Sequence, residues 1–390
     1  MAIRYGFLLL AAALIDPPGS LRSQEKPRTA AELLDMQWSR GKAEGQGPVK
    51  LTTFPLRLED IGQMRPMGMT ASGHVTPSDH LYLIPREPKD KGQKYDVLAV
   101  ADGRIVVVQW RPNPKGGQPD PTVFDRAVDL RVVIEHSATC WSYVDHLVEL
   151  DPAVRKAIDV ELKPGQPVPV RVPVKAGQVI GKVGYQTFDF ALIDTAVARK
   201  GFVRPEQFLA RHPWVLHTVD PFDYVAEPLR GKLLELNPRK VEPFGGRIDY
   251  DVDGRLVGNW YREGTGGFAG LNRRIDYWVG HLAIVPHYID PTRVVISLGD
   301  FEGKPRQFQV KGNAPDPAKV SAADGVVKYE LIRPGTDDRT GKPLVGARDE
   351  VQGVLLVQVL KDRKLRVEVF PGKAAGDVTG FTMVAWIYER

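Results

Sequence analysis

Four of the eight histidines lie between residues 74 and 146, in a stretch with several strand-like runs. His74 and His80 flank a proline-containing turn, whereas His136 and His146 each end a strand-like run. Neutral imidazole is the commonest metal ligand in proteins and a frequent catalytic acid or base. If the runs that end at His136 and His146 form a hairpin, the two side chains would be able to meet across it. The spacing therefore predicts a polar or metal-binding site in this region.

Other reactive side chains of this region give weaker patterns. Ser137 and Ser142 flank His136, but the sequence has no Gly-x-Ser-x-Gly turn of the kind that exposes a hydrolase nucleophile. Cys140 is the single cysteine of the chain, which excludes an internal disulfide and a cysteine-rich zinc module. We interpret Cys140 as an ordinary strand or turn residue and not as a nucleophile.

Five sequence blocks occur in a characteristic order around these histidines. They are HVTPSDHLYL from residue 74, VLAVADGRIVVVQ at 97–109, LRVVIEHSATCWSYVDHL at 130–147, VKAGQVIGKVG at 174–184 and FDFALID at 188–194. The series resembles the lysostaphin-like zinc endopeptidases, which cut peptide cross-links in bacterial cell walls. The resemblance covers roughly residues 70–195. It implies an antiparallel β domain built on a duplicated hybrid motif.

The resemblance also implies roles for single residues. In the family, a histidine and an aspartate of the first block bind zinc, which indicates His74 and Asp79 as metal ligands. The two are five residues apart instead of the usual four, so His80 is an alternative at the aspartate position. His146 matches the catalytic histidine of the Tyr-x-His-Leu block, although one additional residue separates it from Tyr143.

The last block departs most from the family. Asp189 and Ala191 stand where the family has the two histidines of its His-x-His strand, the second of which binds zinc. Catalytic zinc needs about three protein ligands and an open position for water. Alanine donates no lone pair, so the inherited set is too small for tight zinc binding. Asp189 would then accept hydrogen bonds from His80 or His146 in a metal-free polar cluster. The alternative is a rebuilt zinc site of His80, His146 and Asp189, with His136 as a further neighbour.

The rest of the chain predicts a mainly β protein with two domains. The capping box of Thr29 and Glu32 predicts a helix over residues 29–44, within an N-terminal leader at 24–50. Asp151-Pro152 predicts a second short helix through about Leu162, with Pro152 at its first position. The lysostaphin-like domain spans 51–228, with a proline-rich connecting segment from about residue 197. Residues 229–390 form a second antiparallel β domain, either a barrel or a sandwich.

The second domain carries hairpin patterns and one weak motif. Asp253-Gly254 between alternating residues predicts a two-residue type I′ turn, and KDRK at 361–364 predicts a longer hairpin loop. Asp249, Asp251 and Asp253 would share one strand face, which we interpret as solvated and not as a calcium site. Gly-Asn-Trp at 258–260 resembles the Gly-x-Trp of lipocalins, and it is the only feature that favours a ligand-holding barrel.

Composition and the N-terminus restrict the function further. The net charge of +5 without a Lys/Arg block argues against nucleic-acid binding. Arg4 and the apolar run at 6–15 predict a signal peptide over residues 1–23, with no permanent membrane span after its cleavage. We therefore expect an exported protein, periplasmic or extracellular.

Three hypotheses for function follow. The first is a non-catalytic, peptidase-like protein that binds a peptide, a peptidoglycan fragment or a cell-envelope protein, for example through an exposed strand edge. The second is an active zinc metalloendopeptidase that uses the rebuilt ligand set. The third is a ligand carrier whose function resides in the C-terminal β domain.

Overall fold

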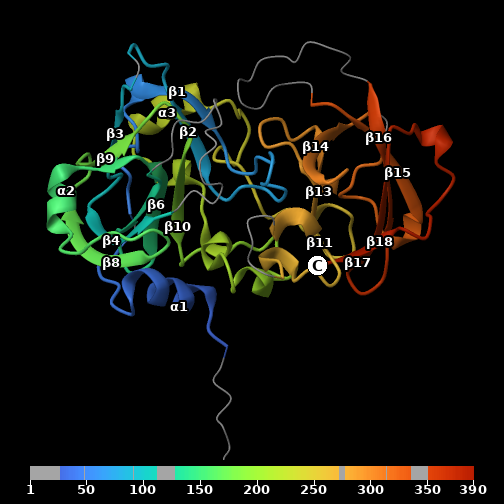
Figure 1. Cartoon of the computed structure of the whole chain (residues 1–390), viewed down its shortest axis with the longest axis horizontal. Coiled ribbons are helices and arrows are strands. Elements are labelled where there is room, and N and C mark those ends of the chain that lie inside the picture. Colours follow the sequence, from blue (N-terminus) through green and yellow to red (C-terminus); the bar gives the residue numbers. More distant parts are fainter. Residues whose placement is uncertain are drawn as a thin grey trace, which may run out of the picture.

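Two β-rich bodies lie side by side in the computed structural model (Figure 1). The structure describes residues 27–47, 49–90, 92–111, 128–271, 277–312, 314–334 and 350–390. The predicted signal segment lies outside these residues. No described helix has both the length and the apolar composition needed to cross a membrane. The expected mainly β, antiparallel class is confirmed.

The first body is built on a seven-stranded antiparallel sheet. Its strands are, in spatial order, β1 (Ile61–Arg65), β2 (Leu81–Pro85), β10 (Phe188–Asp194), β6 (Cys140–Leu147), β5 (Leu130–Glu135), β4 (Gly103–Trp110) and β8 (Pro167–Val174). A smaller sheet of β3 (Tyr95–Leu98), β9 (Val179–Val183) and β7 (Glu149–Leu150) accompanies it. Strands β2, β10 and β6 are neighbours at the centre, although they are far apart in sequence. This order decides which side chains meet in the candidate site.

Short helical elements surround this sheet. The predicted N-terminal helix is present as α1 (Ala30–Leu34), which continues as a π-helical turn η1 (Asp35–Ser39), and both bonds of its capping box form. The helix α2 (Pro152–Ala157) begins at proline as expected but ends earlier than predicted. The connecting segment contains the 3₁₀ turns η3 (Pro205–Phe208), η4 (Pro213–His217) and η5 (Pro221–Asp223), followed by the helix α3 (Leu229–Leu236).

The hairpin of β5 and β6 forms, but one expectation about it is wrong. His136 lies in the turn of the hairpin, because Glu135 pairs with Trp141. His146 lies at the opposite end, where Leu147 pairs with Leu130. The two histidines therefore cannot meet across the strands. Most of strand β6 (Cys140–Leu147) separates them, and a strand rises about 3.3 Å per residue.

The second body is a closed antiparallel barrel, which resolves the choice between barrel and sandwich. Its described strands follow one another around the barrel in chain order: β11 (Gly258–Arg262), β12 (His281–Pro286), β13 (Val294–Phe301), β14 (Lys304–Val310), β15 (Val326–Ile332), β16 (Val351–Val359), β17 (Lys364–Pro371) and β18 (Trp386–Glu389). Apolar side chains from these strands pack in a continuous buried cluster. The predicted hairpin around KDRK is confirmed by the pairing of β16 with β17.

An arginine closes one end of the barrel beside the Gly-x-Trp sequence. The Arg390 guanidinium lies 4.0 Å from the ring centre of Trp260 and is 2% exposed as a residue. It donates hydrogen bonds to the backbone oxygens of Val252, Arg255 and Val257. Trp260 itself donates to the Leu256 oxygen. These contacts fix the segment that leads into β11, so that this barrel end is filled by protein.

The expected type I′ hairpin at Asp253-Gly254 is wrong. The residues before this turn, at 247–252, are not in a strand, and of the two turn residues only Gly254 has a positive φ. A type I′ turn requires a positive φ at both central residues. The Asp251 side chain is instead buried and accepts a hydrogen bond from the backbone N–H of Asn259. Asp249 forms an ion pair with Arg199. These carboxylates tie the connecting segment to both bodies and do not form one solvated face.

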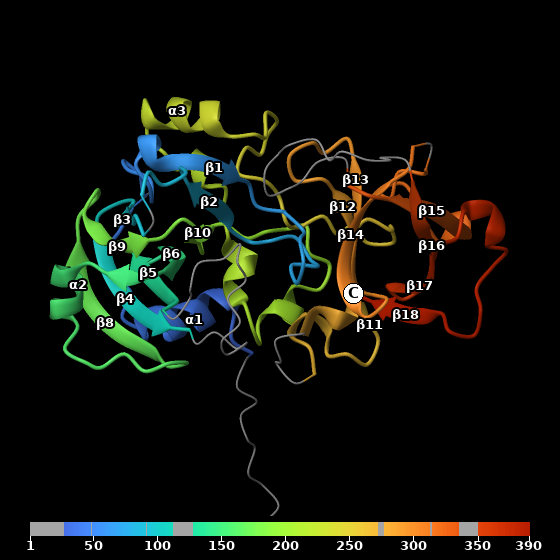
Figure 2. The same cartoon turned by 45° about the horizontal axis from the view of Figure 1, so that its top comes forward.

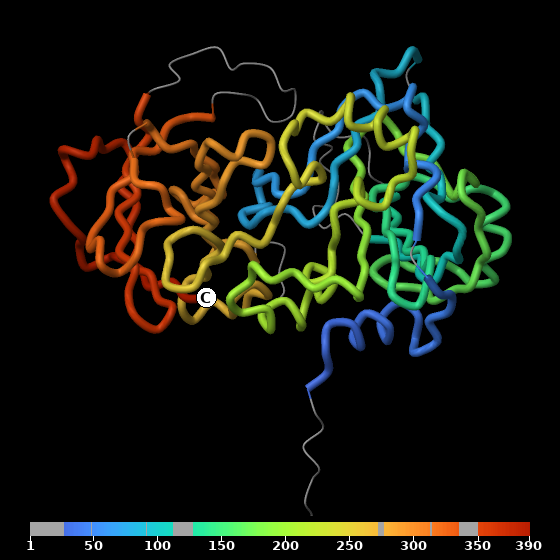
Figure 3. The backbone as a smooth tube through the Cα atoms, turned by 180° about the vertical axis from the view of Figure 1, so that it is seen from behind, coloured from blue at the N-terminus to red at the C-terminus, as the bar shows by residue number. Residues whose placement is uncertain are grey.

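The barrel holds a turn of the first body. Gln307 on β14 accepts a hydrogen bond from the Ser72 amide and donates one to the Ser72 oxygen. The ring of Trp278 lies against Gly73, so closely that a Cβ there would come within 3.1 Å of it. The view from behind shows this blue segment reaching the orange strands of the barrel (Figure 3). The contact fixes the turn that carries His74.

Candidate functional site

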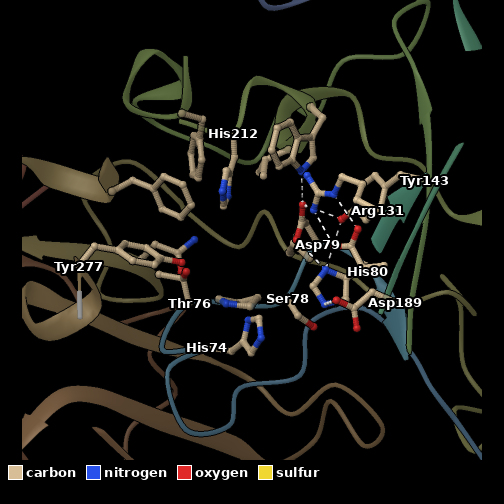
Figure 4. Close-up of a pocket in the computed structure, with 18 of the residues that line it drawn as sticks. His74, Thr76, Ser78, Asp79, His80, Arg131, Tyr143, Asp189, His212 and Tyr277 are labelled. Carbon is tan, nitrogen blue, oxygen red and sulfur yellow. Dashed lines mark hydrogen bonds and ion pairs between the residues drawn. The ribbon is translucent and has the colours of Figure 1, made fainter. Parts of the chain in front are cut away.

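Three neighbouring strands bring the central residues of the candidate site together. Asp189 on β10 lies opposite Tyr82 on β2 and opposite Asp145 on β6. His80 immediately precedes β2, and His146 lies near the end of β6. Asp189 Oδ2 is 3.4 Å from His80 Nε2 and 3.3 Å from His146 Nε2. Asp189 therefore lies within ion-pair distance of both histidines, as expected. Figure 4 shows Asp189 beside His80.

Asp79 orients His80 from its other ring nitrogen. Asp79 Oδ1 is 2.9 Å from His80 Nδ1, and Asp79 Oδ2 accepts a hydrogen bond of 2.6 Å from Trp214 Nε1. The Tyr143 hydroxyl lies 3.5 Å from the same Oδ2. Trp214 is held in turn by stacking between Trp38 of the leader and His212. The leader and the connecting segment thus fix a carboxylate that the sequence suggested as a metal ligand.

Two arginines and two more carboxylates, which the sequence reasoning missed, extend the cluster. Arg111 and Arg131 both bind Asp145, at 2.6 Å each. Arg111 also binds Asp129, which is 3.2 Å from His146 Nδ1. The alternation of the two strands carried a signal, because Arg131 and Asp145 interrupt strongly apolar runs. An inward-pointing charge within such a run requires a buried partner.

The electrostatic environment favours protonated histidines. Burial alone would lower the pKa of His146, but the carboxylates of Asp189 and Asp129 outweigh it and raise the pKa to about 9. For His80, Asp189 and Asp79 likewise outweigh burial and raise the pKa. Burial would raise the pKa of Asp189, but the two imidazoles hold it well below its usual range. His146 and Asp189 therefore form a charged hydrogen-bonded pair near neutral pH. His80 Nε2 lies within ion-pair distance of the same carboxylate without a hydrogen bond to it.

With both imidazoles protonated, the charges of this ion cluster balance. Four positive side chains face four carboxylates: Arg111, Arg131, His80 and His146 against Asp79, Asp129, Asp145 and Asp189. Buried charges are tolerated only when they are paired and hydrogen-bonded. Each charge of the cluster has an opposite charge beside it, but Asp189 Oδ1, His80 Nε2 and Arg111 Nε have no hydrogen-bond partner among the described residues.

His146 has a strained backbone. Its φ is +72°, in the left-handed region that residues with a side chain rarely adopt. The Gln186 side chain donates a hydrogen bond of 2.7 Å to the His146 carbonyl oxygen and so supports this conformation. Such strain persists only where the surroundings fix it, and it is frequent at functional sites. Here it turns the imidazole toward Asp189.

The ion cluster forms one wall of a cavity of about 270 Å³ between the two bodies. His74 lines this cavity, with its ring 5.6 Å from that of His80. The connecting segment contributes His212, whose pKa burial lowers to about 3. The barrel contributes Asn259, Phe268 and Tyr277. Figure 4 shows His74, His212 and Tyr277 around the open space. The site is therefore composed of residues from both bodies.

Some predicted residues lie outside this cavity. His136 donates a hydrogen bond of 3.0 Å from Nδ1 to the Asp102 backbone oxygen, and its Nε2 lies 2.8 Å from the Ser142 hydroxyl. It is therefore not a neighbour of the ion cluster, and the reason is its place in the hairpin turn. Cys140 is buried, and burial raises its pKa above the ordinary value, which disfavours the thiolate. This agrees with our interpretation of Cys140 as an ordinary strand residue.

The residues do not fit a zinc ion well. Within the described part of the chain, no group of three or more His, Cys, Asp or Glu side chains has an arrangement that could hold a metal. Ala191 is buried in the apolar core and offers no ligand. Arg111 and Arg131 add positive charge beside the carboxylates that would have to bind a dication. Both considerations weaken the rebuilt ligand set of His80, His146 and Asp189.

Comparisons with known proteins give distant matches only. No protein-family model matches the chain, and no curated protein does. Similar solved structures include the SpoIIQ–SpoIIIAH pore-forming complex, a zinc-containing peptidase from Vibrio cholerae, and lysostaphin. Their sequence identities to this chain are 15%, 16% and 12%, and the TM-scores are 0.25, 0.19 and 0.24.

The matches differ in extent. They cover 47%, 38% and 88% of this chain, and 96%, 37% and 92% of the respective solved chains. The chain is thus distantly similar to solved structures that include a peptidase. At such low identities and TM-scores, this similarity supports no conclusion about activity.

Proposed function

We propose that this chain is an exported, non-catalytic, peptidase-like protein that binds a peptide or a peptidoglycan fragment in the cavity between its two bodies. The observation that carries the proposal is the ion cluster at the position of the expected metal site. His146 and Asp189, which match catalytic positions of the lysostaphin-like family, bind one another at 3.3 Å. A metallopeptidase needs an open coordination position at this point.

The protonation states support the same proposal. A catalytic histidine that acts as a base must be neutral at the working pH. His146 is held protonated by Asp189 and Asp129, and its pKa is raised to about 9. Its lone pair is thus unavailable near neutral pH. An imidazolium can still donate a hydrogen bond, which is useful for binding a carbonyl or carboxylate group.

The shape of the cavity suggests a small ligand or the end of a larger one. Its volume of about 270 Å³ is slightly below the range of about 300–1,000 Å³ that is typical of small-molecule sites. His74 and Asn259 face it from opposite bodies. The Asn259 side-chain oxygen and Asp189 Oδ1 are buried and have no hydrogen-bond partner among the described residues. Such groups favour a ligand with amide or ammonium donors.

Addition of a peptide strand to the sheet is the less favoured mode of binding. β8 is an edge strand with Pro167, Pro169 and Pro173 at alternate positions. Proline donates no hydrogen bond, so its nitrogen must face away from β4. Three of the eight residues of β8 are thus without an N–H, and a register shift between Pro169 and Val172 further interrupts the regular alternation of this strand. The prolines protect this edge against strand addition.

The proposal is tested with purified mature protein, insoluble peptidoglycan and short glycine-rich peptides. We expect sedimentation of the protein with peptidoglycan and no release of new amino groups, with or without added zinc. Asn259→Leu, which removes the unpartnered acceptor oxygen from the barrel side of the cavity, should weaken binding, whereas Gln358→Leu on β16, outside the cavity, provides a control. Zinc-dependent hydrolysis that is lost in His146→Ala would refute the non-catalytic assignment. Absence of binding to both ligands would refute the binding role.

A further inference from the structure

The first body has a second groove, which shares no lining residue with the interdomain cavity. It has a volume of about 500 Å³ and runs between the leader helix and the edge strand β8. Figures 1 and 2 both place α1 beside β8 and β4. The groove is lined by Trp38, Val106, Pro169, Val170 and three cationic residues, Arg40, Lys42 and Arg171. It thus combines an apolar floor with a positively charged rim.

None of the three cations forms an ion pair with a described residue, although Arg104 and, to a smaller extent, Arg171 lower the pKa of the nearby Glu44 carboxyl. Among the described residues, no carboxylate lies within ion-pair distance of Arg40, Lys42 or Arg171. The neighbouring Arg104 differs, because it is neutralised by Glu44 and Glu135. Like charges that gather around a groove repel one another, and a bound anion would relieve this repulsion. The unbalanced charge distinguishes this groove from the neutral ion cluster of the interdomain cavity.

The guanidinium of Arg171 is held in place by the backbone. It donates a hydrogen bond of 2.7 Å to the Ser39 oxygen and one of 3.3 Å to the Lys42 oxygen. These bonds occupy the carbonyl groups of the last residue of η1 and of a residue just beyond its end, and they leave further N–H donors of the guanidinium unused. A fixed guanidinium loses little entropy when it binds an anion.

The backbone of Arg40 is strained in a way that places its side chain here. Arg40 ends the π-helical turn with a φ of +59°. This left-handed position is usually taken by glycine, because a Cβ is unfavourable there. Glycine does occupy the next position, Gly41. An arginine at the strained position thus costs stability, which is consistent with a function of its charge.

The edge strand indicates what kind of ligand the groove takes. A peptide that paired with β8 would need outward N–H groups, and three of the eight residues of this strand are prolines, which have none. Three cations within one groove instead suit a ligand with two or more negative charges. Guanidinium groups match the oxygens of phosphate in a bidentate manner.

We propose that this groove binds a ligand bearing phosphate groups, held by Arg40, Lys42 and Arg171 over a floor formed by Trp38 and Pro169. The groove shares no lining residue with the interdomain cavity, although Trp38 stacks on Trp214 of that cavity. The proposal does not rest on the function proposed for the cavity. The phosphate can belong to a soluble compound or to a lipid headgroup, which present the same chemistry to the three cations.

Binding to the intact protein is measured by calorimetry with pyrophosphate and by flotation with vesicles. Citrate serves as a carboxylate probe of similar charge. Vesicles of phosphatidylglycerol, compared with phosphatidylcholine, test the lipid source. We expect the affinity for pyrophosphate or for phosphatidylglycerol vesicles to fall about tenfold in Lys42→Gln/Arg171→Gln. It should also fall with rising salt concentration.

Matched variants make the test decisive. Lys304→Gln/Arg306→Gln removes the same charge from the exposed surface of β14 and should leave binding unchanged. Arg40→Gln should also weaken binding. Because no hydrogen bond of the Arg40 side chain to another described residue is found, weaker binding by this variant would not be explained by unfolding. Binding of vesicles alone would identify a lipid headgroup as the source. An equal loss in the control, tighter binding of citrate than pyrophosphate, or no binding of either phosphate probe would overturn the proposal.

Discussion

Replacement of Asp189 by asparagine tests the ion cluster most directly. The amide keeps the size of the side chain but removes the charge that faces His80 and His146 at 3.4 and 3.3 Å. The rise of the His146 pKa from 6.5 to about 9 corresponds to about 3 kcal/mol in favour of the imidazolium, and Asp189 is the largest contributor to that rise. Breaking a buried ion pair on one side costs about 3–5 kcal/mol. We therefore expect Asp189→Asn to lose on the order of 3 kcal/mol of unfolding free energy at pH 6.

The pH dependence of this loss distinguishes the ion pair from simple packing. Above pH 9 the folded wild-type protein itself loses the proton of His146, so the pair no longer stabilises it. The difference between wild type and Asp189→Asn should then shrink at pH 10. Urea denaturation at both pH values measures it. Asp324→Asn, whose carboxylate accepts hydrogen bonds from the Ser321 N–H and hydroxyl, is a control because these partners do not titrate between pH 6 and 10. A difference that is equal or larger at pH 10 would refute the reasoning.

Two further predictions concern stability. In the wild-type protein, the folded-state pKa of His146 is raised, so its contribution to stability is complete below about pH 6.5 and is lost as the pH rises through about 9. His146→Gln should remove this part of the curve in denaturation experiments at successive pH values, and parallel profiles for the two proteins would contradict the assignment. Arg390→Met should destabilise the chain by about 2–4 kcal/mol, because three backbone acceptors lose their buried donor. Thermal unfolding measures this, and Arg366→Met, whose guanidinium stacks on Phe381, should cost less than about 1 kcal/mol.

The sequence predicted those features that depend on local patterns. The capping box of Thr29 and Glu32, the proline start of α2 and the β16–β17 hairpin are present because neighbouring residues determine them. The type I′ turn at Asp253-Gly254 failed for a tertiary reason. Asp251 is bound by the Asn259 amide and by Val203 N–H, which draws the segment out of any strand pairing.

The candidate site was predictable in its centre and not in its surroundings. The order of the five sequence blocks, compared with the lysostaphin-like family, suggested that Asp189 would lie beside His80 or His146. The adjacency of β2, β10 and β6 places all three residues together. His212 and Trp214 could not be found in this way, since they reach the site through 3₁₀ turns without a periodic pattern. The barrel residues depend on the docking of two bodies, which no local signal encodes.

The contacts of the barrel with the turn around Ser72 restrict how the sequence of this chain can change in evolution. Gln307 satisfies both backbone groups of Ser72, and Trp278 occupies the space beside Gly73. Exchange of the barrel for another module through recombination would leave these groups without partners and open the cavity to water. We therefore expect the two bodies to be inherited together and to co-evolve at this contact.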